Sequence, residues 1–274
     1  MTKQGKYRYL ALMLRGIAMN SDKTGRIVWH DLFTADAHLS QSFYERVAGW
    51  SYLVEHATNF AWGGGEGDYI LSVLSNEAGA GIVEPNMPHL RGWVPYVEVD
   101  DVDQAAERCV GLCGRVVKPP FEVPGVGRNC LLCDPNGAFV GICFSRHAFP
   151  APTKQFGPEV YLSQSNDYPD DFYDELFGWK RQTESNRDDV THSIMRADAN
   201  VGLNHTAVVD PWSPIWVPSV RVGKFAHALD QVLEMNGEIV SQQKCKFEKH
   251  DIALIRETNG TYSYLLDQQE NGTG

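Results

Sequence analysis

The amino-acid sequence predicts an α+β fold of two tandem halves. Each half is expected to contain two β-α-β-β-β modules that form a curved eight-stranded mixed sheet around a cleft. Two observations support this prediction: a long internal repeat, and hydrophobic periodicities that alternate between strand and helix in the same order in each copy. The chain has 274 residues, enough for two domains that each bury a core.

The repeat is defined by four landmarks that recur in the same order. They are Phe43-Tyr44 with Phe172-Tyr173, Gly49-Trp50 with Gly178-Trp179, Trp93-Val94-Pro95 with Trp216-Val217-Pro218, and Asn136-Gly137 with Asn259-Gly260. The first two pairs are 129 positions apart and the last two are 123 apart. The second copy has therefore lost about six residues between the Gly-Trp and Trp-Val-Pro landmarks.

In the first half, helix ends are marked by residues with suitable capping chemistry. Asp36 and Asp101 are predicted N-caps, because a carboxylate there can accept from free backbone amides, and Gly49 is the predicted helix stop. Pro119–Gly127 is predicted to be a loop from its Pro and Gly content. The predicted strands are Arg26–Thr34, Trp50–His56, Tyr69–Leu74, Gly79–Val83, Trp93–Val99, Arg115–Lys118, Arg128–Cys133 and Ala138–Phe144, and the second helix is Val102–Val110.

The second half repeats this order. Its predicted strands are Glu159–Gln164, Trp179–Glu184, His192–Arg196, Gly202–Val209, Trp216–Val222, Glu238–Val240, Asp251–Arg256 and Tyr262–Leu266, and its helices are Tyr168–Phe177 and Phe225–Met235. We therefore expect a flexible N-terminal leader over residues 1–24, a first domain over 25–146, a linker over 147–156 and a second domain over 157–268.

Composition narrows the classes of function. Hydrophobic residues make up 43% and charged residues 22%, which is typical of a globular protein. The formal net charge of −11 disfavours nucleic acid as a partner, and no stretch is long and apolar enough for a membrane span. The basic and apolar start of the chain lacks a clear cleavage site. We therefore predict a cytoplasmic monomer or homodimer with a small-molecule ligand.

Four of the six cysteines have a spacing that invites a metal interpretation: Cys109, Cys113, Cys130 and Cys133. However, the first pair lies in a predicted helix and its end, whereas the second pair lies on a predicted strand. Positions three apart on a strand face opposite sides. We therefore favour small buried thiols over a zinc site.

Asp31 and Glu159 are the predicted catalytic residues, each a carboxylate on the first strand of its half. Strand alternation places Ile27, Trp29, Asp31 and Phe33 on one face and His30 on the other. If the first face lines the cleft, Asp31 is a general base or a hydrogen-bond acceptor for the substrate. The alternative is a structural carboxylate that pairs with a backbone amide or with Arg128.

Aromatic residues near Asp31 could form a cavity for a planar or apolar ligand. The predicted substrate-binding residues are Trp29, Phe33, Trp62, Tyr96, Arg128 and Tyr161. Arg128 would reach an anionic group, and Tyr161 shares the strand of Glu159. The alternatives are ordinary core packing for the aromatic rings and a solvated loop-edge cation for Arg128.

Several strings resemble the vicinal oxygen chelate superfamily, which includes glyoxalases, bleomycin-resistance proteins and extradiol dioxygenases. They are Trp-His-Asp-Leu-x-Thr-x-Asp from Trp29, the Phe-Tyr and Gly-Trp landmarks, Gly-Trp-Val-Pro-Tyr from Gly92, and Asp-Pro-x-Gly-Ala from Asp134. The resemblance covers about Gly25 to Asp267, and its tandem form is similar to actinobacterial antigen-type and hydroxylase-annotated members. It implies the paired-module fold and a small-molecule site, but spans lyases, isomerases, dioxygenases and binding proteins.

The resemblance also implies where metal ligands would lie. In the first half these positions are Trp29, a residue near Val94, and Gly141. In the second half they are Pro158 or Glu159, Val217 and Tyr264. A divalent cation needs oxygen, nitrogen or thiolate donors, so we predict no metal ligands and no cofactor.

Three functions are consistent with this sequence. The first is metal-independent lyase or isomerase chemistry, with Asp31 or Glu159 as acid–base residue. The second is a protein that binds a metabolite or drug without changing it. The third is a metal-dependent lyase or dioxygenase with unusual ligands, such as His30, Glu84 or Glu159.

Overall fold

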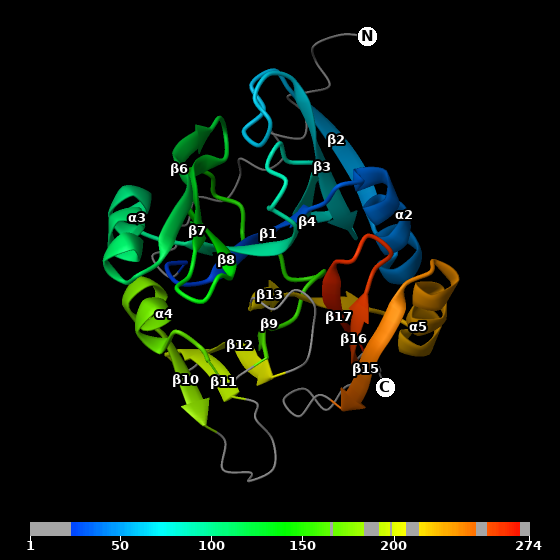
Figure 1. Cartoon of the computed structure of the whole chain (residues 1–274). Coiled ribbons are helices and arrows are strands. Elements are labelled where there is room, and N and C mark those ends of the chain that lie inside the picture. Colours follow the sequence, from blue (N-terminus) through cyan, green and yellow to red (C-terminus); the bar gives the residue numbers. More distant parts are fainter. Residues whose placement is uncertain are drawn as a thin grey trace.

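The first half of the chain forms one mixed eight-stranded sheet with the order β2-β3-β4-β1-β5-β8-β7-β6 (Figure 1). The computed structural model describes residues 23–164, 167–183, 192–197, 199–206, 214–244 and 251–268. The strands of this sheet are β1 (Ile27–Phe33), β2 (Ser51–Ala57), β3 (Gly67–Leu74), β4 (Glu77–Val83), β5 (Gly92–Glu98), β6 (Arg115–Val123), β7 (Gly127–Cys133) and β8 (Phe139–Ser145). The predicted α+β class is confirmed.

The two helices of the first half begin where the sequence predicts. In α2 (Ala37–Ala48) the Leu39 amide donates to Oδ1 of Asp36 at 2.8 Å, and Gly49 ends the helix with φ 69°. In α3 (Val102–Gly111) the amides of Asp103 and Gln104 donate to Oδ1 of Asp101 at 2.9 and 3.0 Å. Each N-cap satisfies donors that have no partner inside the helix, which fixes the strand-to-helix turn.

The second half divides its strands between two adjoining sheets, with orders β10-β11-β12-β9-β13 and β14-β17-β16-β15. They meet at Pro218, which lacks a backbone N–H and separates β13 from β14. The elements are β9 (Glu159–Ser163), α4 (Asp170–Phe177), β10 (Trp179–Thr183), β11 (His192–Arg196), β12 (Ala199–Thr206), β13 (Ile215–Val217), β14 (Ser219–Val222), α5 (Phe225–Glu234), β15 (Glu238–Lys244), β16 (Asp251–Arg256) and β17 (Tyr262–Asp267). The predicted strand residues Glu184 and 207–209, and leader residues 1–22, lie outside the described residues.

The predicted loop after Lys118 is wrong in its first part, because β6 continues through Pro119 and Pro120 to Val123. This strand lies at the edge of the sheet and pairs only with β7, with register shifts on both sides of Lys118. Proline is tolerated at an edge because its missing N–H need not join a ladder. In the described part of the chain, no helix could cross a membrane.

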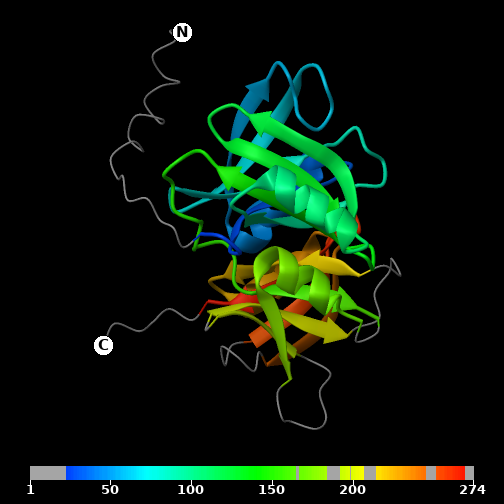
Figure 2. The same cartoon turned by 90° about the vertical axis from the view of Figure 1, so that its left-hand side faces the viewer.

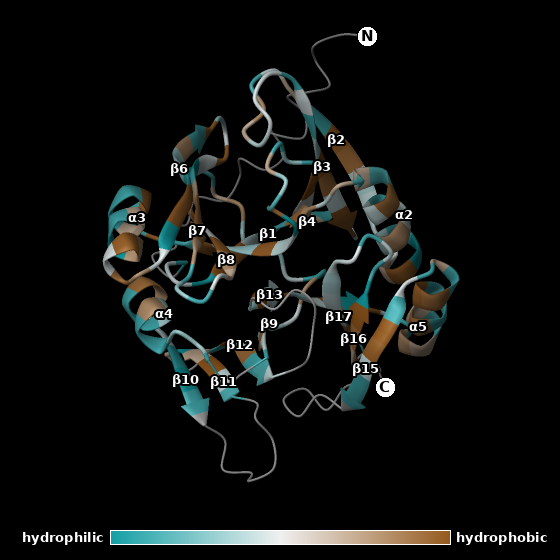
Figure 3. Ribbon diagram, viewed as in Figure 1, coloured by the Kyte–Doolittle hydropathy of each residue, from teal (hydrophilic) through white to brown (hydrophobic). Residues whose placement is uncertain are grey.

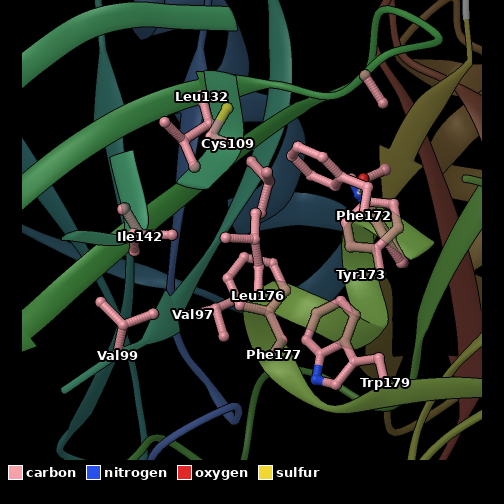
Figure 4. Close-up of a cluster of buried hydrophobic side chains, with 14 of the residues drawn as sticks. Val97, Val99, Cys109, Leu132, Ile142, Phe172, Tyr173, Leu176, Phe177 and Trp179 are labelled. Atoms are coloured by element: carbon pink, nitrogen blue, oxygen red, sulfur yellow. Dashed lines mark hydrogen bonds between the residues drawn. The ribbon is translucent and has the colours of Figure 1, made fainter. Parts of the chain in front are cut away.

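The halves pack against each other through their helices, with α2 beside α5 and α3 beside α4 (Figures 1 and 2). Two hydrophobic clusters therefore contain residues of both halves. One joins β5, α3 and β8 to α4 and β9; the other joins α2 and β1 to α5, β16 and β17. Figure 4 shows the first cluster, where Val97 lies beside Leu176 and Phe177 of the other half.

Each sheet consequently has two buried faces. The helix face packs on the helices and on the other half, whereas the opposite face, which we call the inner face, carries a separate cluster in each half. Apolar residues follow the strands of both halves, while polar residues gather on the outer surfaces of the helices (Figure 3). Hydrophobicity alone therefore does not distinguish the two faces of these strands.

Candidate functional site

Asp31 lies on the inner face of the first half and is 3% exposed. Its Oδ1 atom accepts a hydrogen bond from the Tyr69 hydroxyl at 2.5 Å and from the Trp29 indole N–H at 3.1 Å. The same indole N–H also donates to the Tyr69 oxygen at 2.8 Å. Strands β1 and β3 thus supply a buried carboxylate with two fixed donors on one oxygen.

Burial raises the pKa of Asp31 from 3.8 to about 6, because desolvation disfavours the charged form. The hydroxyls of Tyr69 and Tyr96, the Trp29 indole and the charge of His30 act in the opposite direction on this pKa. The Tyr96 hydroxyl is close enough to have this effect, yet no hydrogen bond of good geometry engages it in the described structure. A pKa near 6 suits a carboxylate that accepts a proton at neutral pH.

Two glycines make room for this arrangement. Gly81 is the partner of Asp31 across β1 and β4, and a Cβ there would lie 2.1 Å from the Tyr69 hydroxyl oxygen and 2.6 Å from Oδ1 of Asp31. A Cβ on Gly141 would lie 2.3 Å from the Tyr96 ring. Glycine is therefore required at both positions, because a side chain at either one would displace Tyr69 or Tyr96. Sequence reasoning did not identify Tyr69 or Gly81.

The predicted aromatic residues Trp29 and Tyr96 lie beside Asp31, and Phe33 and Trp62 belong to the same inner-face cluster. Phe33 and Trp62 meet edge to face with ring centres 4.7 Å apart. Lys118 lies beyond them, with Nζ 5.5 Å from the centre of the Trp62 ring. Trp62 and Tyr96 are 6% and 3% exposed, so this inner-face cluster is closely packed.

A β-bulge changes the predicted faces at the start of β1. The pairing with β5 shifts between Ile27 and Trp29, so that Ile27 packs in a helix-face cluster and Val28 joins Trp29 on the inner face. An extra residue in one strand reverses the alternation before it and leaves the alternation after it unchanged. The prediction that Trp29, Asp31 and Phe33 share a face therefore agrees with the structure, whereas the prediction for Ile27 does not.

Glu159 does not lie near Asp31. It is 1% exposed on β9, where its Oε1 contacts Nε2 of His30 across the boundary between the halves, and its Oε2 has no hydrogen-bond partner among the described residues. His30 lies against the Phe156 ring, with ring centres 4.1 Å apart. The catalytic role predicted for Glu159 remains a prediction, and its surroundings are an interface between halves.

Arg128 and Tyr161 also lie on helix faces. Arg128 binds the Asp103 carboxylate on α3 through Nε and Nη2, both at 2.6 Å, and therefore does not pair with Asp31. The Tyr161 hydroxyl donates to Oδ2 of Asp134 at 2.8 Å. Glu84, a proposed unusual metal ligand, accepts from the Ala37 amide at 2.7 Å. None of these contacts brings the side chain to Asp31.

Among the described residues, the inner face of the second half has no equivalent of this group. At the repeat spacing of 129, Val160 occupies the position of Asp31, and at 123, Tyr264 occupies that of Gly141. The described cluster there consists of aliphatic residues and two tyrosines: Val160, Leu162, Leu203, Val217, Ile252, Leu254, Tyr262, Tyr264 and Leu266. The described carboxylate site therefore belongs to the first half.

The cysteines are largely buried, as predicted. Cys109 and Cys130 pack in the helix-face core, and Cys133 is 2% exposed, whereas Cys113 is exposed. Burial raises the pKa of Cys109 and of Cys130 to about 12, so both are protonated thiols at neutral pH. Cys245 lies outside the described residues.

Comparison with known proteins identifies the family. The chain is 31% identical over 185 residues to the putative glyoxylase CFP32 of Mycobacterium bovis, which covers 64% of this chain and 68% of that protein. The chain belongs to the vicinal oxygen chelate superfamily. It is also 28% identical over 125 residues to the anthracycline biosynthesis protein DnrV of Streptomyces peucetius, across 42% of this chain and 45% of that one. No family model matches the chain.

Solved structures of the superfamily share this fold. The Mn(II)-bound glyoxalase from Novosphingobium aromaticivorans matches 90% of this chain and 83% of its own, with a TM-score of 0.59 and 12% identity. The 2,3-dioxygenase LapB from Pseudomonas sp. KL28 matches 90% and 93%, with a TM-score of 0.60 and 10% identity. At these identities the likeness concerns the fold alone.

In the first half, the residues at the superfamily's metal positions do not fit a divalent cation. Trp29 offers only an N–H donor, Val94 has no polar atom, and the space beside Gly141 contains the Tyr96 ring. Within the described ranges, no three His, Cys, Asp or Glu side chains are grouped so that they could hold a metal ion.

Proposed function

We propose that this protein is a metal-independent lyase or isomerase of the vicinal oxygen chelate superfamily, with Asp31 as general base. The observation that carries the proposal is a single buried carboxylate whose Oδ1 accepts from Tyr69 and Trp29. Its raised pKa of about 6 leaves it mostly ionised, yet basic, at neutral pH.

The surroundings of Asp31 suit removal of a proton next to a carbonyl group. The carboxylate would take the proton from the substrate carbon, and the electron pair would move onto the carbonyl oxygen as an enolate. The Tyr96 hydroxyl, which lies beside Asp31, would turn to donate to that oxygen. Return of the proton to another carbon gives an isomer, and loss of a neighbouring leaving group gives a lyase product.

The substrate class follows from the aromatic surroundings. Trp29, Phe33, Trp62 and Tyr96 favour a planar, oxygen-rich or aromatic molecule, because ring faces stack and few polar groups compete. One similar protein is named for anthracycline biosynthesis. We therefore propose aromatic ketones and quinones as the first compounds to test.

The test is turnover of a panel of such compounds by the wild-type protein and by Asp31→Asn. The variant should lose about 10²- to 10⁴-fold in rate, the range for a positioned general base. Asp103→Asn is the matched control, because Asp103 binds Arg128 on the helix face. Full activity in Asp31→Asn would contradict the base assignment, and activity lost to a chelator and restored by a divalent ion would contradict metal independence.

A binding protein is the second candidate, and the aromatic character of the inner face favours it. The rings of Phe33, Trp62 and Tyr96 would contact a planar ligand once these side chains, which are at most 6% exposed, move apart to admit it. In this case a compound would bind with a stoichiometry of one per chain and be recovered unchanged. Asp31→Asn would then alter affinity without any product being formed by either protein.

A further inference from the structure

A hollow lies between the halves, on the helix face rather than the inner face. Its volume is about 570 Å³, within the range of small-molecule sites. The first half contributes Thr24, Val99, Asp100 and Arg108, and the second contributes Leu176, Phe177, Gly178, Arg196 and Ala197. It is therefore separate from the group around Asp31.

The floor and walls of this hollow differ in chemistry. Val99, Leu176 and Phe177 are at most 6% exposed and supply an apolar floor that both halves share (Figure 4). Arg108 and Arg196 supply positive charge on either side. The acid among the lining residues, Asp100, accepts a hydrogen bond from the Thr24 hydroxyl at 2.5 Å. The lining has an excess of positive charge in a chain whose formal net charge is −11.

The Arg196 side chain is held in place by the chain entering β1. A Cβ on Gly25 would lie 2.6 Å from Nε of Arg196 and 2.4 Å from the Phe177 carbonyl oxygen, so only glycine allows this approach. Ala197, the next residue, adopts φ 50°, a conformation that is costly for a residue with a side chain. Strained backbone that persists beside a hollow is often found at ligand sites.

At the opposite junction between the halves, the arginine side chain has partners on the facing helix. There Arg46 of α2 donates to Gln231 of α5 at 3.0 Å and to Glu234 at 3.4 Å, so its guanidinium is occupied. On α3, the described residues give the Arg108 guanidinium no ion pair or side-chain hydrogen bond. An arginine beside an apolar floor favours a planar anion, which it can bind with two parallel hydrogen bonds.

We propose that this hollow is a binding site for a small carboxylate with an aromatic or other apolar body. The carboxylate would bind Arg108, in a hollow that the positive charge of Arg196 also lines, and the apolar body would cover Val99, Leu176 and Phe177. Because the ligand contacts both halves of the folded chain, binding would stabilise the native protein by mass action. The site does not depend on the function proposed for Asp31.

The experiment uses benzoate as the probe, with inorganic phosphate as an anion lacking an apolar body, at constant ionic strength. Benzoate should bind the wild-type chain in calorimetric titration, raise the melting temperature, and bind more tightly than phosphate. Arg108→Ala should weaken benzoate binding at least about tenfold, as expected for loss of a charge-assisted hydrogen bond. Arg46→Ala, at the opposite junction, is the matched control and should bind as the wild type does.

Three outcomes would overturn the proposal: no benzoate binding by the wild type, equal or tighter binding of phosphate, or equal losses in Arg108→Ala and Arg46→Ala. Asp31→Asn is included so that the two sites can be told apart. Benzoate binding that is lost in Asp31→Asn but retained in Arg108→Ala would assign the probe to the inner face and contradict the hollow as its site.

Discussion

The Tyr173 hydroxyl donates a hydrogen bond of 2.9 Å to Oδ2 of Asp134, which belongs to the other half of the chain. The Trp216 indole N–H in turn donates to the Tyr173 oxygen at 2.8 Å. Oδ1 of Asp134 accepts from the backbone amides of its own turn, including Gly137 at 2.7 Å. Residues of the repeated motifs thus meet at the boundary between the halves.

The other junction has the same arrangement with the halves exchanged. The Trp93 indole donates to the Tyr44 hydroxyl at 3.0 Å, and Tyr44 donates to Ser263 at 3.3 Å. Glu257, which stands 123 positions after Asp134, is buried beside them. The recurring motifs therefore explain how the halves dock, and they are not the chemical site. Their spacing in the sequence indicated the duplication but not this function.

Replacing Tyr173 by Phe should destabilise the protein by about 1–3 kcal/mol, because Asp134 and Trp216 would each lose a buried partner. Urea unfolding at neutral pH measures this cost. Tyr52→Phe is the control, since the Tyr52 hydroxyl donates to the Gln41 carbonyl within one half at 2.8 Å, and it should cost about 0.5–1.5 kcal/mol. Equal costs for the two variants would show that Tyr173 does not link the halves.

Glu257 should make stability depend on pH. Burial raises its pKa from 4.5 to about 8, whereas the nearby polar groups of Thr261, Ser40 and Tyr44 act to lower it, and its Oε1 has no hydrogen-bond partner among the described residues. The folded chain therefore retains a proton that the unfolded chain releases above about pH 4.5. The contribution of this carboxyl is most favourable below that pH and is lost as the pH rises towards 8.

Glu257→Gln removes this titration while preserving the shape of the side chain. The free energy of unfolding of the variant, minus that of the wild type, should increase by about 1–3 kcal/mol between pH 5 and pH 8. Taking the difference cancels the contribution of Asp31, whose pKa is also raised. Glu234→Gln, at a side chain that is 57% exposed, controls for the loss of one negative charge. A difference that does not change with pH would contradict the buried acid.

The fold could be predicted because its signals are local. Asp36, Asp101 and Gly49 act on the turns next to them, and the repeat then applied one solution to both halves. The prediction of a loop starting at Pro119 was wrong because the deciding contacts are not local. Whether proline ends a strand depends on whether that strand is at a sheet edge, which is decided by pairing with residues distant in the sequence.

The site could be predicted only in part. Alternation correctly grouped Trp29, Asp31 and Phe33, but it does not say which face of a strand is the inner one. Both faces of β9 are buried, with Tyr161 on one and Val160 on the other, so burial does not decide the question. Tyr69 was missed because its contact with Asp31 requires β4 to lie between their strands and Gly81 to leave space.

His30 and Glu159 are equivalent positions of the repeat, separated by 129 residues, and they contact each other across the boundary between the halves. A residue that contacts its own equivalent lies next to the axis that relates the two copies. Two identical subunits would place the same side chain on both sides of such an axis. The duplicated chain instead places an imidazole against a carboxylate, which is a complementary pair.

Replacing one member of this pair should lower the free energy of unfolding far more than replacing both. His30→Leu leaves the Glu159 carboxylate buried without a partner and should destabilise the protein by about 3–5 kcal/mol. The double variant His30→Leu with Glu159→Leu should recover most of that loss, because two apolar side chains can pack beside the Phe156 ring. Urea unfolding of the wild type, both single variants and the double variant gives the coupling energy. Additive costs would show that the contact does not act as a pair. Turnover by the double variant separately tests the predicted catalytic role of Glu159, since full activity would exclude that role while leaving the stability argument intact.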